Sequence, residues 1–265
     1  MNEARERSRD PDGMEGRWLH CTLRQFVVLA AAIAFLAPAA AETQVPPFSG
    51  MTAGAGVTGW TALKPSAKAA DTLYTLVRDG DATVLKADAR HSMSGLIYAV
   101  KVDVRQFPRI RWRWKISAPV AGGDLRTKAG DDYAARIYVM FDYPLEKLSF
   151  STRTKLKLAE TIYGQKIPSA ALNYVWDNRL PVGTIAPNSF TDRARMVVVE
   201  TGAARAGQWV TETRDLVADF RAAFGEDPPD IVAVALATDT DNTGETAGAW
   251  YGDIELLPAA TSPAQ

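Results

Sequence analysis

Residues Arg109–Ile116 read Arg-Ile-Arg-Trp-Arg-Trp-Lys-Ile, an unbroken alternation of cationic and apolar side chains. Successive side chains of a β-strand point to opposite faces, whereas a helix would distribute these residues around its circumference. The stretch is therefore predicted to be a strand whose two faces differ. One face carries Ile110, Trp112, Trp114 and Ile116, and the other carries Arg109, Arg111, Arg113 and Lys115. Such a strand belongs to a half-buried sheet.

Short apolar or alternating runs recur along the chain, separated by turn residues. With 109–116 they predict about ten strands, the others being 73–77, 83–87, 95–104, 136–141, 171–176, 195–201, 208–213, 231–238 and 249–256. An Asp-Gly pair at positions 79 and 80 predicts a hairpin between the first two. Many short strands at this spacing are typical of a β-sandwich or β-barrel.

Two stretches instead have the helical spacing of apolar residues. The first is 151–163, and the second is 215–224, which Asp215 can cap and Gly225 can end. Helix-bearing insertions of this length fit a jelly-roll sandwich better than a tight up-and-down barrel. The predicted fold class is therefore all-β, a jelly-roll β-sandwich with one or two short helical insertions, with the barrel as the alternative.

The N-terminal region has the layout of a secretory signal peptide. An uncharged apolar run at 26–36 follows Arg17 and Arg24, and precedes Pro38 and the small residues 39–41. The run is shorter than the roughly 20 apolar residues of a membrane helix. Residues 1–41 are therefore predicted to be cleaved after Ala41, which implies a periplasmic or secreted protein with no membrane attachment afterwards. A retained anchor is the alternative.

The start of translation can be Met1 or Met14, since the segment from Met14 has a normal signal layout by itself. The only cysteine, Cys21, would leave with the signal, so the mature chain has no thiol for a disulfide or a metal site.

The chain after residue 41 divides into a flexible leader (42–58), a single β-sandwich domain (59–257) and a tail (258–265). The net charge of −1, without a basic patch that includes aromatic residues, speaks against a nucleic-acid partner.

Several motifs in order carry a resemblance to a known family. They are Trp-Arg-Trp-Lys at 112–115, Asp-Asp-Tyr-Ala-Ala-Arg-Ile-Tyr-Val at 131–139, Leu-Asn-Tyr-Val-Trp at 172–176, Gly-Gln-Trp at 207–209, Asp-Thr-Asp-Asn-Thr-Gly-Glu at 239–245 and Trp-Tyr-Gly-Asp-Ile at 250–254. Together they resemble the DUF3047 family, exported bacterial proteins of unknown function, over residues 73–257. More loosely, the strand order and the last motif are similar to galactose-binding-like jelly rolls, which include carbohydrate-binding modules. Neither resemblance supplies catalytic residues.

The polar strand faces are the first candidate site. If these faces coincide, they form a groove of guanidinium, phenol and amide groups, which bind sugar hydroxyls and carboxylates. The residues are Arg111, Arg113, Arg136, Tyr138 and Asn173. The alternative is internal: the arginines pair with aspartates in a buried or half-buried layer.

The second candidate is a cation site in the loop at 239–245. Asp239, Asp241, Thr243 and the following glycine match the first half of a calcium-loop pattern, with oxygen ligands at alternate positions. Residue 250 is Trp where an EF-hand has Glu, so Glu245 would have to complete the set. The alternative is a polar turn whose side chains bond their own backbone.

The leading function hypothesis is an exported, non-catalytic protein that binds a saccharide or another polyhydroxylated or anionic glycan, with calcium as a candidate cofactor. A second hypothesis is a carboxylate-dependent glycan hydrolase or lyase, which needs two acidic residues in one cleft. A third is a structural envelope-assembly protein without a small ligand, which predicts a large exposed apolar patch. Each of the six tryptophans after residue 41 is expected in the core rather than on a binding surface.

Overall fold

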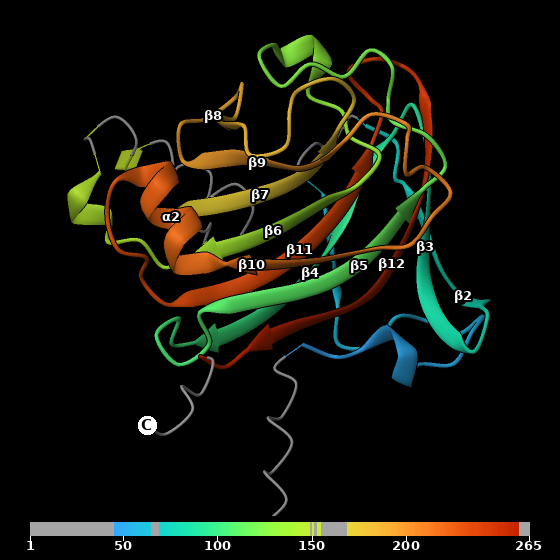
Figure 1. Cartoon of the computed structure of the whole chain (residues 1–265), viewed down its shortest axis with the longest axis horizontal. Coiled ribbons are helices and arrows are strands. Elements are labelled where there is room, and N and C mark those ends of the chain that lie inside the picture. The colour runs from blue at the N-terminus through green and yellow to red at the C-terminus, as the bar shows by residue number, and fades with distance from the viewer. Residues whose placement is uncertain (1–44, 65–68, 149, 151–152, 155–168, 260–265) are drawn as a thin grey trace, which may run out of the picture. The chain divides into compact units, whose positions relative to one another are not determined.

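The computed structural model describes residues 45–64, 69–148, 150, 153–154 and 169–259, and these form two sheets packed on each other (Figure 1). The larger sheet has seven strands in the order β1-β4-β11-β6-β7-β9-β8, and the smaller has five in the order β10-β5-β12-β3-β2. All neighbouring strands are antiparallel except β7 and β9. The predicted β-sandwich is confirmed, and the barrel alternative is wrong because each sheet has two edges.

The ten strands expected from the sequence are all present, and two three-residue strands, β1 and β8, join them. The larger sheet contains β1 (Thr61–Leu63), β4 (Met93–Val102), β6 (Arg136–Phe141), β7 (Ala170–Asp177), β8 (Ile185–Pro187), β9 (Ala194–Thr201) and β11 (Ile231–Asp239). The smaller contains β2 (Leu73–Asp79), β3 (Ala82–Arg90), β5 (Arg109–Ile116), β10 (Val210–Asp215) and β12 (Thr246–Leu257). Three short 3-10 turns are η1 (Phe48–Gly50), η2 (Lys128–Gly130) and η3 (Leu145–Lys147).

The chain passes repeatedly from one sheet to the other. It crosses from β4 to β5 and back to β6, and again from β9 through β10 to β11 and β12. Such crossing connections are those of a jelly-roll rather than of hairpins stacked in sequence order. As a result, residues far apart in sequence become neighbours within each sheet.

The core lies between the sheets, and the alternation of β5 places its indoles there. Trp112 and Trp114 are buried, and Trp112 packs on Tyr174 of β7 with ring centroids 5.2 Å apart. The ring centroid of Trp114 lies 6.0 Å from that of Trp176, which is also on β7 in the opposite sheet. Burial of such large apolar side chains is the main stabilising contribution to a fold of this kind.

The helix α2 (Leu216–Phe224) lies at one end of the sandwich (Figure 1). As predicted, the Asp215 carboxylate accepts hydrogen bonds from the first-turn amides of Val217 and Ala218, both at 2.9 Å. Gly225 ends the helix with a φ of 78°, a left-handed conformation that glycine adopts without steric cost. Phe220 of α2 packs edge-on against Phe141 of β6.

Some expectations fall beyond the described residues. The signal peptide at 1–41 lies wholly outside them, and the first predicted helix, 151–163, lies mostly outside them. Within the part of the chain that is described, no helix has the length and apolar character needed to cross a membrane.

Part of the leader expected at 42–58 packs against the sandwich. Val45 and Phe48 are fully buried, and Phe48 stacks on Trp60 with ring centroids 5.2 Å apart. The backbone amide of Ser49 donates to the Asp253 carboxylate at 2.9 Å. Burial of two apolar side chains offsets the entropy that an ordered leader loses, and the composition of the segment did not show this.

Candidate functional site

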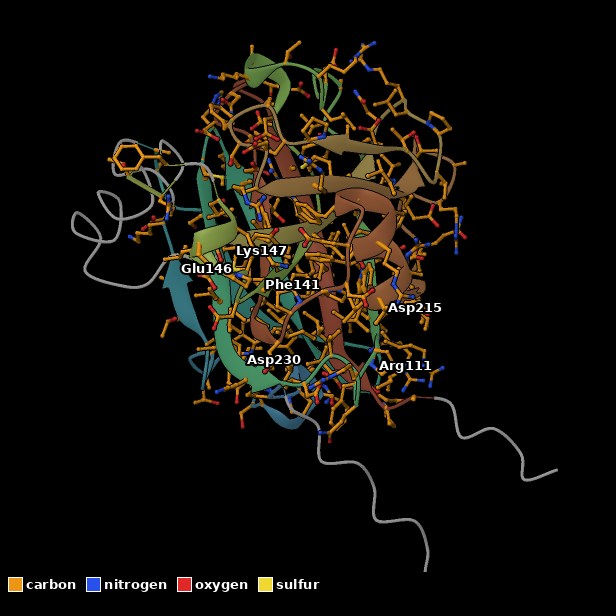
Figure 2. All side chains as sticks on the ribbon, turned by 90° about the vertical axis from the view of Figure 1, so that its left-hand side faces the viewer. Arg111, Phe141, Glu146, Lys147, Asp215 and Asp230 are labelled. Atoms are coloured by element: carbon orange, nitrogen blue, oxygen red, sulfur yellow. The ribbon has the colours of Figure 1, made fainter. Side chains whose placement is uncertain are left out.

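The outward face of the five-stranded sheet carries the polar half of the β5 alternation. Arg111 and Arg113 lie on this face because Trp112 and Trp114 occupy the opposite, buried one. Arg111 is the more exposed, with 48% of its side chain accessible. Figure 2 shows Arg111 at the periphery of the molecule, whereas the buried Phe141 lies well inside it.

Two half-buried indoles share this face with the cations. Arg113 lies over the ring of Trp209, with 4.6 Å between its guanidinium carbon and the ring centroid. The Lys115 ammonium is 5.0 Å from the centroid of Trp209 and 4.7 Å from that of Trp250, and the Lys86 ammonium is 5.8 Å from that of Trp250. We call this surface the cation–indole face; it consists of Lys86, Arg111, Arg113, Lys115, Trp209 and Trp250.

An irregularity in β12 creates a hollow beside these residues. Tyr251 is opposite Trp114 and Ile254 is opposite Trp112, so two residues, Gly252 and Asp253, face the single Arg113. This is the arrangement of a β-bulge, which bends a strand and redirects side chains. The hollow has a volume of about 320 Å³ and is lined by Arg111, Trp112, Arg113, Thr211, Asp253 and Glu255. Its size is at the lower end of the roughly 300–1,000 Å³ of small-molecule sites.

Most charges on the cation–indole face have partners. Arg111 donates to Glu255 at 2.6 Å, and the Lys115 ammonium forms an ion pair with Asp79. The hydrogen bond from Lys115, followed by its charge and a hydrogen bond from Trp209, keeps the pKa of Asp79 below its ordinary value. Both Asp253 oxygens accept hydrogen bonds from Ser49. The face is thus preorganised by contacts among its own residues.

The remaining predicted ligand-binding residues lie in the other sheet. Arg136 and Tyr138 are on β6, and Asn173 is on β7 directly opposite Tyr138. The expected single groove is therefore wrong: the strand order separates these three from Arg111 and Arg113. Moreover, Arg136 and Asn173 are almost fully buried, so neither lies in an open groove. The internal alternative is the observed one for Arg136.

Arg136 lies at the centre of a carboxylate cluster made of Asp131, Asp132, Asp239 and Asp241. Its Nε donates to Asp239 Oδ1 at 2.8 Å, its Nη2 contacts Asp239 Oδ2, and its Nη1 lies 3.4 Å from Asp131 Oδ1 and 3.2 Å from the Tyr138 hydroxyl. Burial alone would lower the pKa of Arg136, but the negative charge of Asp239, with that of Asp131, raises it. Arg136 is therefore a buried cation.

The carboxylates around the predicted cation site are grouped differently from the expected set. One carboxylate oxygen from each of Asp132, Asp239 and Asp241 lies within 4.8 Å of the other two. Glu245 is instead bound by the backbone amides of Ala121 and Gly122, at 3.0 and 2.6 Å. The amide of Thr243 donates to Asp132 Oδ2 at 2.6 Å. Asp132 thus joins Asp239 and Asp241 where Glu245 was expected, because the 239–245 loop folds over residue 132.

The sequence interpretation missed some residues of the cation–indole face. Four of the six tryptophans are in the core as expected, but Trp209 and Trp250 are not. Lys115 of this face, and Gly252 beside it, were also not predicted to be site residues. Gly252 carried a usable signal, since a glycine inside a strand pattern indicates a bulge or a close approach.

The fold and its outer face define a β-sandwich protein with a charged, aromatic surface on its smaller sheet. A family model described as protein of unknown function (DUF3047) matches residues 58–255, and the chain belongs to this family. This confirms the resemblance found in the motifs. A comparison with curated proteins finds no match.

Two solved structures are similar in outline. The endoglucanase 3 of Trichoderma harzianum, from family GH12, has 10% identity and a TM-score of 0.39, with 83% of this chain and 99% of that chain covered. The cellulose induced protein Cip1 has 13% identity and a TM-score of 0.35, with 75% and 90% covered. With TM-scores below 0.5, these likenesses carry no statement about what this chain binds.

Proposed function

We propose that this chain is an exported, non-catalytic glycan-binding protein, and that a saccharide binds at the cation–indole face. Export rests on the signal layout of residues 1–41. Saccharide binding rests on one observation above all: Trp209 and Trp250 lie half-buried on the outward face of a sheet, beside a hollow lined by guanidinium, carboxylate and hydroxyl groups.

The chemistry of these groups suits a sugar. An indole covers the apolar face of a pyranose ring, while carboxylates and guanidinium groups exchange hydrogen bonds with its hydroxyls. In the hollow, Glu255 and Asp253 can accept from hydroxyls, and Arg111 and Arg113 can donate. Because the cations already lie on the indoles, little side-chain entropy is lost when a ligand binds.

The hydrolase alternative has less support. It needs two acidic residues in one cleft, at least one with a raised pKa and neither committed to a cation. Asp131 and Asp239 both contact the buried Arg136, and Asp132 accepts from the backbone amides of Asn242 and Thr243. Burial, with the charge of Asp132, raises the pKa of Asp241, the exposed member of the cluster. Asp241 therefore meets the requirement for an acid with a raised pKa, but the cluster supplies no second uncommitted carboxylate beside it.

The envelope-assembly alternative predicts an extended apolar patch. The large exposed apolar side chains of the described residues are Leu73, Phe150, Val182, Ile185 and Phe190. They belong to three separate stretches of the chain.

Binding can be measured directly. We expect the mature protein to be retarded in native gels that contain at least one soluble plant or bacterial polysaccharide. Trp209→Ala and Trp250→Ala should each weaken binding about tenfold or more, the loss typical of a central aromatic contact. Phe190→Ala, which removes an exposed ring far from the face in sequence, is the matched control and should bind normally. Absence of retardation by every polysaccharide, with and without calcium, would overturn the proposal.

A further inference from the structure

We infer that Arg113 is the recognition group for an acidic sugar, and that the glycan bound at the cation–indole face carries carboxylate groups, as in a uronate polymer. This inference rests on the proposed function and narrows it from glycans in general to one chemical class. The carboxylate of the sugar would lie against the Arg113 guanidinium, inside the hollow.

Arg113 differs from every other cation of the face. Lys86 pairs with Asp88 at 2.9 Å, Arg111 pairs with Glu255, and Lys115 pairs with Asp79. Among residues 45–64, 69–148, 150, 153–154 and 169–259, nothing forms a hydrogen bond or an ion pair with the guanidinium of Arg113. Its donors are therefore available to a ligand, although the residue is half-buried and lines the hollow.

The side chain is also held in place. The ring of Trp209 lies on one side of the guanidinium, 4.6 Å from its central carbon. Gly252 lies against the aliphatic part, where an added Cβ would be 2.5 Å from Nε and 3.0 Å from Cδ. A guanidinium confined in this way presents its donors as a fixed fork, which matches the two oxygens of a carboxylate. Preorganisation of this kind reduces the entropy lost on binding.

The carboxylates of the hollow form no ion pair with Arg113. Glu255 is taken by Arg111, and Asp253 accepts from the amide and hydroxyl of Ser49. No nitrogen of Arg113 comes within ion-pair distance of either, within the described part of the chain. The two acidic residues can still accept from sugar hydroxyls, and Thr211 adds a hydroxyl. A guanidinium without an ion-pair partner, among groups that bind hydroxyls, is the pattern that fits an acidic sugar.

The test compares acidic and neutral ligands of equal length. Oligogalacturonides and cello-oligosaccharides are titrated into the mature protein at low and high salt, with tryptophan fluorescence and calorimetry as readouts. We expect the acidic ligand to bind at least about tenfold tighter at low salt, the worth of one charge-assisted contact. High salt should reduce the difference. A sulfated oligosaccharide serves as a second anionic ligand and should bind more weakly than the carboxylate.

Variants assign the preference to one residue. Arg113→Gln should lower the affinity for the acidic ligand far more than the affinity for the neutral one, so that the preference is lost, and Arg113→Lys should keep part of the preference. Arg78→Gln, which removes an exposed cation of β2 outside the hollow, is the matched control. Melting temperatures verify that each variant folds. Equal affinity for both ligands, or a preference that survives Arg113→Gln, would overturn the inference alone, whereas no binding of any ligand would overturn the proposed function as well.

Discussion

Gly252 of β12 lies directly against the side chain of Arg113 on β5: a Cβ at position 252 would come within 2.5 Å of Arg113 Nε. The register shift between Tyr251 and Ile254 produces this approach. The bulge and the missing side chain together leave room for the guanidinium to lie between the sheet and Trp209. The shape of the hollow therefore depends on a residue that has no side chain.

Gly252→Ala should consequently disturb Arg113 without unfolding the protein. The new methyl group would force the arginine out of its place, at a cost of about 1–3 kcal/mol in the free energy of unfolding, as is typical for overpacking. Urea denaturation measures the loss of stability and glycan titration measures the loss of affinity. The affinity of Gly252→Ala for the acidic glycan should fall about as far as that of Arg113→Gln. Gly248→Ala on the same strand is the control, because a Cβ there would meet Ser117 Oγ only at 3.3 Å. It should reduce the free energy of unfolding and the glycan affinity less than Gly252→Ala does. Unaltered binding by Gly252→Ala would contradict the role given to this contact.

Removal of Arg136 should be far more damaging than removal of any cation on the outward face. Arg136→Ala would leave Asp131 and Asp239 buried without their cation, which typically costs about 3–5 kcal/mol. Chemical denaturation should show this loss, or the variant should fail to accumulate as folded protein. Arg111→Gln is the comparison, since its exposed pair with Glu255 contributes about 0–1 kcal/mol. Similar losses for both variants would mean that the Arg136 contacts are not the stabilising ones.

The contrast between Arg113 and Arg136 shows what the sequence could and could not predict. The period-two pattern of 109–116 was sufficient to place the indoles inside and Arg113 outside, because it depends only on local geometry. It could not show that Arg136, on a strand of the same kind, points into a buried layer, since its partner Asp239 is 103 residues away. That pairing requires the order β11-β6-β7 in one sheet. Sheet order is set by long-range packing, and no periodicity contains it.

The same limit applies to the indoles. Trp250 and Tyr251 must face opposite sides of β12, but the alternation alone does not say which one is inside. In the structure Tyr251 is buried, and its hydroxyl donates to the carbonyl of Ala237 in the other sheet at 2.6 Å. Trp250 is therefore directed to the outside, where it contacts Lys115. A phenol that finds an acceptor across the core decides the orientation.

Glu212 of β10 should make the stability of the protein depend on pH. Burial, followed by the charge of Glu200, raises the pKa of the Glu212 carboxyl to about 7 from an ordinary value of 4.5. Between these two values the folded state retains a proton that the unfolded chain has lost, so stability falls as the pH rises through this window. Because Glu212 is only partly buried, we expect the loss to be about 1–2 kcal/mol.

Glu212→Gln should abolish this loss. At pH 8 the variant should be more stable than the parent by that amount, and at pH 4 the two should be nearly equal. Thermal or urea unfolding over pH 4–8 measures the difference. The exposed Glu146→Gln provides a control that should follow the parent at every pH. A constant difference between Glu212→Gln and the parent across the range would show that the carboxyl does not titrate in this window.

Calcium at the carboxylate cluster stays a prediction, now with a changed ligand set. Asp131, Asp132, Asp239 and Asp241 bring four carboxylates around the single guanidinium of Arg136, and three of them approach within 4.8 Å. Such an excess of oxygen ligands and negative charge favours a hard divalent cation. We expect millimolar calcium to raise the melting temperature, with a stabilisation that grows as the logarithm of the calcium concentration.

The ligand set can be separated by two variants. Asp241→Asn removes the exposed carboxylate without breaking the pair between Arg136 and Asp239, and should abolish the calcium-dependent shift while the apo melting temperature remains near that of the parent. Glu245→Gln tests the set expected from the loop pattern; because Glu245 is bound by the amides of residues 121 and 122, it should leave the calcium response intact. A response lost with Glu245→Gln and kept with Asp241→Asn would favour the original pattern. If calcium does not change the melting temperature of the parent protein, the cluster binds no calcium and Arg136 alone offsets its negative charge.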